Sequence, residues 1–139
     1  LFIVSISFFL SAQDELTIIS PHRKSIQQEL IPLYKKYYKG KYKKDVSVRW
    51  LDQGGTENNL RYVMGKYKAS PKSSGIDVFW GGGDFTFLEL ERLKLLEKIH
   101  LNNKLKKQLP KSAAGLETSA ETTLARRRAS NASHLWGTN

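Results

Sequence analysis

The 139-residue chain contains no cysteine. Disulfide bonds, cysteine-ligated zinc and a thiol nucleophile are therefore excluded for this chain. The sequence also lacks a GxGxxG loop, a GxxxxGK[ST] phosphate-binding loop and a GxSxG nucleophile elbow. Its histidines, His22, His100 and His134, do not have the HExxH spacing of a metal site. The sequence thus predicts no catalytic residues, no cofactor and no metal.

What is present is the composition of an ordinary soluble globular protein, with 40% hydrophobic and 26% charged residues. Residues 1–12 open with an uncharged apolar run, LFIVSISFFLS, which ends at the small residues Ser11 and Ala12. This run is shorter than the roughly 20 residues that span a membrane, and it resembles the apolar core and cleavage site of a signal peptide. We therefore expect a signal-peptide remnant and export to the periplasm or another extracytoplasmic location. A buried strand or helix is the alternative.

The formal net charge is +10, from 23 basic and 13 acidic residues. Such an excess suits nucleic acids or anionic surfaces. The densest run, residues 35–44 (KKYYKGKYKK), lies where a first helix is expected to end, and cations are favourable beside the negative end of a helix dipole. We interpret the run as a solvated helix end and expect no nucleic-acid partner.

Strand and helix patterns alternate along the chain. Residues 15–20, 45–51 and 75–80 are β-rich or apolar runs of strand length. A helix is expected over residues 25–38, closed by Gly40, with Pro32 inside it and a buried face at Ile26, Leu30, Leu33, Tyr34 and Tyr37.

Two more helices follow the second and third strands. One is expected to begin at an N-cap Thr56 and to bury Leu60, Val63, Met64 and Tyr67. The other carries apolar residues at Phe85, Phe87, Leu88, Leu90, Leu93, Leu95 and Leu96. Three strand–helix units in a row predict an α/β fold with a mostly parallel sheet and right-handed crossovers.

The composition changes near the end of the chain. All lysines lie between Lys24 and Lys111, and residues 126–128 are three consecutive arginines. We expect one α/β domain over residues 13–115 and an irregular or aberrant tail over residues 116–139. A disordered tail, a truncated gene or a frameshifted end could produce this change, and we favour the last two.

The candidate binding residues follow the three strands. Ligands of open α/β sheets lie outside the carboxyl ends of the strands, where loops lead into helix N-termini. Glycines allow close backbone approach there, and free amides favour an anion. The predicted ligand-binding residues are Ser20 and His22 after the first strand, Gln53, Gly54, Gly55 and Thr56 after the second, and Trp80, Gly81, Gly82, Gly83 and Asp84 after the third. Most aromatic residues near the strand ends are expected in the core, but Trp80, directly before Gly81, could instead line the cleft and stack on the ligand.

Three segments, LTIISPH, WLDQGGTENNLRYV and GIDVFWGGGDFTFLELERLKLLEKI, resemble the first lobe of bacterial extracellular solute-binding proteins of family 1. The resemblance runs from Leu16 to Gly115, and its most specific part is residues 76–84. It implies the first lobe of a type II periplasmic-binding-protein fold, with ligand contacts near Ser20, His22, Gly55, Thr56, Gly82 and Gly83. It also implies a second lobe that completes the cleft, and the sequence beyond Gly115 departs from the family pattern.

We therefore expect a monomeric, non-enzymatic solute-binding component of an ABC importer, acting with a membrane permease and its ATPase. Its ligand would be a small solute of the ferric-iron, polyamine, thiamine or phosphonate classes. The alternatives are a small α/β transferase-type enzyme that uses the same loops and a basic nucleic-acid-binding module that uses residues 35–44 and 126–128.

Overall fold

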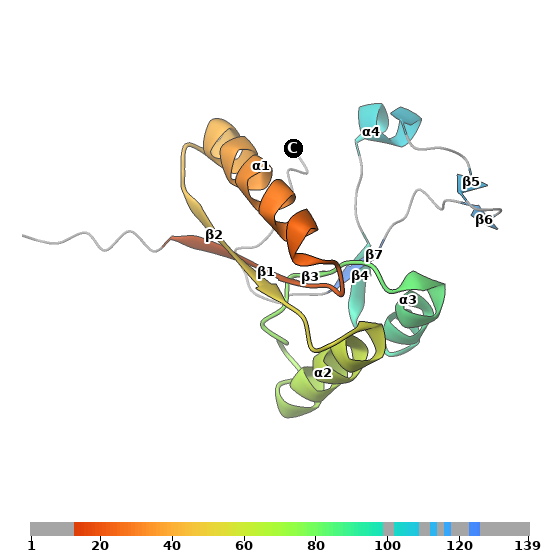
Figure 1. Cartoon of the computed structure of the whole chain (residues 1–139). Helices are drawn as coiled ribbons and strands as arrows, with labels where there is room; N and C mark the ends of the chain where they lie inside the picture. Colours follow the sequence, from red (N-terminus) through yellow and green to blue (C-terminus); the bar gives the residue numbers. More distant parts are fainter. Residues whose placement is uncertain (1–12, 99–101, 109–111, 114–115, 118–122, 126–139) are drawn as a thin grey trace, which may run out of the picture.

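The computed structural model describes residues 13–98, 102–108, 112–113, 116–117 and 123–125 (Figure 1). Its elements in chain order are β1 (Asp14–Ile19), α1 (Lys24–Tyr42), β2 (Val46–Leu51), α2 (Thr56–Ala69), β3 (Val78–Phe79), α3 (Gly83–Arg92), β4 (Leu96–Lys98), α4 (Asn103–Gln108), β5 (Ser112–Ala113), β6 (Leu116–Glu117) and β7 (Thr123–Ala125). Strands and helices alternate from β1 to α3. The predicted α/β organisation of this part of the chain is confirmed.

The main sheet has three strands in the order β2-β1-β3, and both pairings are parallel. Asp14 pairs with Val46 and Ile19 with Leu51, so β1 and β2 are in register along their whole length. β1 is central because the chain places β2 along one of its edges and then crosses over to place β3 along the other. All three strands therefore end at the same edge, and α1, α2 and α3 begin there (Figure 1).

Side chains of β1 alternate between two apolar layers, as the twofold period of a strand requires. Leu16 packs with Tyr38 and Val46 on the face that α1 covers. Ile19 packs on the other face in a larger cluster that α2 and α3 complete, which contains Leu60, Val63, Tyr67, Ile76, Phe79 and Leu90. Figure 1 shows α1 on one side of the sheet and α2 on the other.

A buried carboxylate strengthens the link between β1 and the segment before β3. Asp77 is almost fully buried, and its Oδ2 accepts a hydrogen bond of 2.8 Å from the amide of Thr17. The Asp77 amide donates in turn to the Thr17 carbonyl at 2.9 Å. These two hydrogen bonds lengthen the contact between β1 and the β3 segment, because β3 itself contains only Val78 and Phe79.

The predicted ends of two helices are wrong. α1 continues through Pro32 and Gly40 to Tyr42, and Lys43 closes it with a left-handed φ of 58°. The aromatic packing of Tyr42 on Tyr38 holds the last turn to the sheet and overrides the helix-breaking tendency of Gly40. α3 ends at Arg92 rather than near Leu96, because Lys94 adopts φ 56° and turns the chain into β4.

The helical spacing of apolar residues predicted the buried faces of the three helices only in part. The prediction is confirmed for Leu60, Val63 and Tyr67 on α2, which are buried. On α1, however, Leu30, Leu33 and Tyr37 are exposed and only Tyr38 is fully buried. On α3, Leu90 of the predicted apolar set is buried, but Phe85 and Leu88 are exposed, and Thr86, which was outside that set, is buried.

The end of the chain is described only in short pieces. β4 pairs antiparallel with β7, where Leu96 lies opposite Ala125, and β5 pairs antiparallel with β6. Strands therefore occur in the segment expected to be irregular. The expected signal-peptide remnant, residues 1–12, and the arginines at 126–128 lie outside the described residues.

The tyrosines between α1 and the sheet predict a loss of stability at high pH. Burial, followed by the neighbouring Tyr42 and Tyr37, raises the pKa of Tyr34 to about 12. Burial and the bond of 2.7 Å from the Tyr38 hydroxyl to Asp14 raise the pKa of Tyr38 further. Both values exceed the unfolded value near 10, so the unfolded chain ionises first. Stability should be intact below about pH 10 and fall as the pH rises toward 12.

Urea unfolding at pH 8, 10 and 11.5 measures this loss, and absorbance at 295 nm follows phenolate formation. Tyr38→Phe should remove one late-ionising group and flatten the pH dependence. Simultaneous ionisation of all six tyrosines near pH 10 in a chain that is still folded by circular dichroism would contradict the prediction.

Candidate functional site

The three predicted loops meet at the carboxyl edge of the sheet, and two glycines bring them together. A Cβ atom on Gly81 would lie 2.6 Å from Cε1 of His22, in the loop after β1. A Cβ atom on Gly82 would lie 2.6 Å from Cγ2 of Thr56, at the start of α2. The loop after β3 thus packs between the other two, at distances that no residue with a side chain permits.

The hydroxyl of Ser20 fixes the position of His22. The Ser20 hydroxyl lies 2.6 Å from Nδ1 of His22 and also accepts a bond of 3.3 Å from the His22 amide. Ser20 itself is fully buried. Within the described part of the chain Nε2 of His22 has no hydrogen-bond partner. Ser20 therefore positions the imidazole, and Nε2 is the nitrogen left to face another group.

Trp80 forms the wall beside His22. The two rings stack with their centroids 4.6 Å apart and an interplanar angle of 28°. Trp50 meets Trp80 edge-on at 5.4 Å, and its indole nitrogen donates to the Ser20 carbonyl at 3.4 Å. Trp80 is half-buried at the edge where it was predicted, but one of its faces is already covered by His22.

The loop after β2 uses its amides internally. Asp52 Oδ1 accepts hydrogen bonds from the amides of Gly54 and Gly55, at 3.0 and 3.1 Å. The amide of Gln53 donates to Asn59 Oδ1 at 2.7 Å. A carboxylate of the chain thus occupies the position where an anionic ligand was expected, as Asp side chains do in turns. Thr56 is the first residue of α2 rather than its N-cap, because Gly55 with φ 115° takes that place.

The loop after β3 keeps its amides available. Gly81, Gly82 and Gly83 have φ values of 85°, 102° and 74°, a conformation that favours glycine. The amides of Gly81 and Gly82 donate to no acceptor in the described part of the chain. Gly82 is the N-cap of α3, and its carbonyl accepts from Thr86 Oγ1 at 3.1 Å. Asp84 lies exposed in the first turn of the helix.

The arrangement supplies a small set of hydrogen-bonding groups. His22 Nε2, the amides at Gly81 and Gly82 and the positive end of α3 can bind an anionic group of a solute. The exposed carboxylate of Asp84 can bind a cationic group. Gln53 is exposed next to the Asp52 turn and does not bond to the other two loops through its amide.

Three residues that shape this edge were not among the predicted ones. The Asp52 carboxylate accepts hydrogen bonds from the amides of the glycine turn, and Asn59 Oδ1 accepts one from the Gln53 amide. The buried Thr86 packs near Gly82. The Asp-x-Gly-Gly spacing signals the Asp52 turn, because Asp side chains accept from amides two residues on. Asn59 is fully buried, and its Nδ2 has no partner among the described residues. Its position one turn into a helix gave no such signal.

No family model matches the sequence, and neither a curated protein nor a solved structure matches it. Within the described ranges, no group of three or more His, Asp or Glu side chains is placed to hold a metal ion. The same ranges contain no helix with the length and apolarity needed to cross a membrane. The loop geometry therefore carries the functional argument.

Two glycine variants test whether the close packing of the loops matters. Gly83→Ala meets no atom within 4 Å, so it should lower the free energy of unfolding by only the left-handed strain, about 1–2 kcal/mol. Gly82→Ala adds a contact with the Thr56 methyl and should lower it by about 1–3 kcal/mol more. Urea unfolding measures both values.

Thr56→Ser removes that methyl group and serves as the partner in a double-mutant cycle. In the Gly82→Ala background it should recover part of the lost stability, while in the Gly83→Ala background it should recover none. Equal losses for the two alanine variants would show that Gly82 and Thr56 do not pack as described.

Proposed function

We propose that this chain is the first lobe of an extracytoplasmic solute-binding component of an ABC importer, with the type II periplasmic-binding-protein fold. It binds a small solute without catalysis and delivers it to a membrane permease and its ATPase. The parallel α/β unit with its three loops at one edge supports this proposal, because ligands of such sheets bind outside the carboxyl ends of the strands.

One observation carries the proposal. Gly81 and Gly82 lie so close to His22 and Thr56 that the three loops form one continuous surface with donors on it. The donors are the amides of Gly81 and Gly82, joined by Nε2 of His22 in the tautomer whose Nδ1 accepts from the Ser20 hydroxyl. Together they suit a carboxylate, phosphate or phosphonate group. Asp84 suits the amine of a polyamine or the cationic ring of a thiamine-like solute. Ferric iron would need additional ligands from the facing lobe.

The surface is one wall of a cleft, and this sets the expected affinity. A buried ligand needs contacts on most of its area, which two lobes provide when they close over it. A single wall leaves half of the solute in water. We therefore expect millimolar affinity for this chain, equivalent to about −4 kcal/mol.

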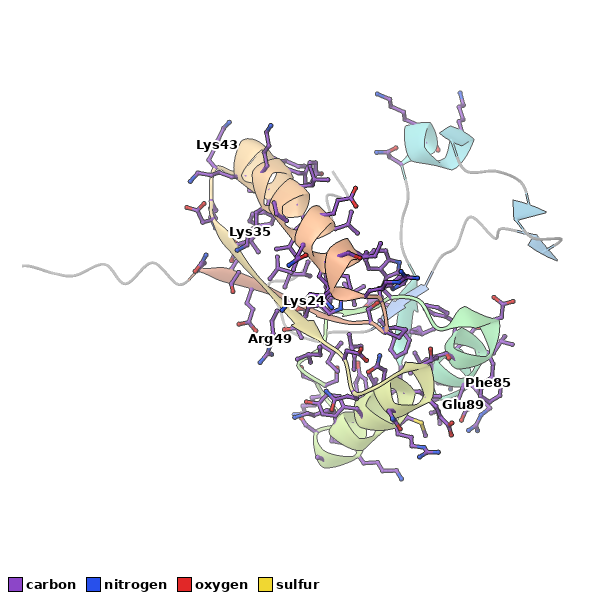
Figure 2. The ribbon with its side chains drawn as sticks, viewed as in Figure 1. Lys24, Lys35, Lys43, Arg49, Phe85 and Glu89 are labelled. Carbon is purple, nitrogen blue, oxygen red and sulfur yellow. The ribbon has the colours of Figure 1, made fainter. Side chains whose placement is uncertain are left out.

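The same geometry bears on the enzymatic alternative. A nucleophile must be accessible to its substrate, yet the Ser20 hydroxyl is buried beneath His22 and bonded to it. The close Ser20–His22 pair therefore acts as a support for the imidazole. The nucleic-acid alternative draws on the lysines of α1, which lie on a different side of the molecule from α3 (Figure 2).

Tryptophan fluorescence tests the proposed wall. In a Trp136→Phe background, Trp50 and Trp80 are the reporters. Phosphate, methylphosphonate, spermidine and thiamine are the solutes to titrate. At least one should change the emission in a saturable way with half-saturation near 1 mM. His22→Ala removes both the ring that stacks on Trp80 and the Nε2 donor, so it should weaken that response at least tenfold.

Lys35→Ala is the matched control, because it removes a cation on α1 far from the loops and should leave the response unchanged. An equal loss in Lys35→Ala would show that the response does not depend on the loop edge and would contradict the proposed wall. Saturable binding of a DNA duplex that weakens steeply with salt, without any response to solutes, would favour the nucleic-acid module instead. Micromolar affinity in calorimetry would contradict the single-wall interpretation.

A further inference from the structure

A groove of about 430 Å³ runs between α1 and the sheet, and it is a different place from the loop edge. Its floor is made of alternate β-strand residues that face α1, such as Ile18, Val48 and Val78. Ile31 and Tyr34 of α1 form the opposite side, and Trp50 and Trp80 close the end near His22. The lining is almost wholly apolar, so the groove is built to receive apolar side chains rather than a polar solute.

The open rim of the groove is also apolar. Leu33 is 58% exposed and Tyr37 is 52% exposed, although both line it. Lys36 follows Leu33 by three residues and so lies beside it on the helix surface. The Nζ atom of Lys41 lies 5.8 Å from the centre of the Tyr37 ring. In the described part of the chain neither lysine has a carboxylate partner. The rim therefore combines an exposed apolar ridge with cations.

α3 presents the complementary surface. Phe85 is 75% exposed and Leu88 is 62% exposed, and their spacing of three places them on one face of the helix. Asp84 and Glu91 lie four and three residues from Leu88 and are exposed. α3 thus carries two apolar anchors flanked by carboxylates, the pattern of a helix that docks in a groove.

The two surfaces cannot meet within one chain. α1 covers one face of the sheet, while α3 packs with α2 in the apolar layer of the other face. Figure 2 shows Phe85 and Glu89 on α3 and Lys35 and Lys43 on α1, at separate sides of the molecule. A second copy of the chain supplies what one copy cannot.

We propose that the groove beside α1 is the docking site for α3 of a second copy of this chain. Phe85 and Leu88 enter the groove next to Leu33 and Tyr37, while Asp84 and Glu91 lie near Lys36 and Lys41. The contact is head-to-tail, so in a pair one copy keeps a free α3 and the other keeps a free groove. Further copies can add to both ends, which gives a ring if the rotation between copies closes and a filament if it does not. This inference departs from the expected monomer and is independent of the proposed solute.

Charge complementarity selects this occupant. α1 has five lysines and one glutamate, whereas α3 has three acidic residues and one arginine. The net charge of +10 opposes association at long range, but at 0.15 M salt such repulsion is screened beyond about 8 Å. Ion pairs at the rim lie within that distance. A flat membrane surface would contact Leu33 and Tyr37 but would not fill the concave groove.

Mixing two association-deficient variants of the full chain gives a sharp test. Leu33→Glu blocks the groove and Phe85→Lys blocks α3, and both positions are exposed, so the fold should survive. The wild type should show a weight-average mass that rises above the monomer mass of 15.9 kDa with concentration in sedimentation equilibrium. Each variant alone should remain near the monomer mass. An equal mixture should form a dimer of twice that mass, because one intact groove meets one intact α3.

Gln28→Glu adds one negative charge at an exposed position of α1 and should associate like the wild type. Circular dichroism verifies that each variant is folded. A monomeric wild type overturns the proposal, as do variants that associate on their own or a mixture that remains monomeric. Co-sedimentation of the wild type, but not of Leu33→Glu, with phosphatidylglycerol vesicles in the absence of self-association would assign the groove to a membrane and likewise overturn it.

Discussion

The absence of side chains at Gly81 and Gly82 is the constraint on which the carboxyl edge of the sheet depends. A Cβ atom at either position would overlap the side chain of His22 or Thr56, so either that side chain or the loop after β3 would have to shift. A shift at Gly81 would disturb the stacking of His22 on Trp80. The position of β1 between β2 and β3 brings the three loops to one edge, but the two glycines convert neighbouring loops into one surface.

The order of strands and helices could be predicted from the sequence because its signals are local. An alternating run such as VSVRW reads as a strand in isolation, and the glycines after it mark the turn. Element ends were harder because tertiary contacts decide them. Gly40 looks like a helix stop, yet Tyr42 packs on Tyr38 and carries α1 past it. The segment over residues 93–96 has helical spacing, but the left-handed Lys94 redirects it into β4.

In the candidate site, too, the sequence predicted some features and tertiary contacts decided the others. Convergence of the three loops follows from parallel topology, which the sequence pattern contained. Which amides are available does not follow, because this depends on side chains that fold back onto the loops. Asp52 satisfies Gly54 and Gly55, and Asn59 satisfies Gln53, so the second loop contributes shape more than donors. Ser20 was predicted to bind the ligand, but it is fully buried and its hydroxyl contacts Nδ1 of His22.

Apolar residues of α1 and α3 are exposed because the sheet offers too little surface to cover them, although their spacing along the sequence is that of a buried helix face. The spacing of Leu30, Leu33 and Tyr37 is that of a buried helical face, but a three-stranded sheet is too narrow to cover it. β3 contributes only two residues to that sheet, so the floor of the groove stops at Val78 and Trp80. Apolar surface of this kind marks an interaction site when it is contiguous.

Trp80 belongs to both functional surfaces, and this links them. One face of its ring stacks on His22 at the loop edge, and the residue also lines the groove beside α1. Any molecule that fills the groove therefore changes the surroundings of the ring that supports His22. If docking of α3 favours one arrangement of Trp80 and His22, a solute that binds the same arrangement must favour docking by an equal free energy, because such linkage is reciprocal. The two proposals can fail separately, but if both hold they are coupled through one indole ring.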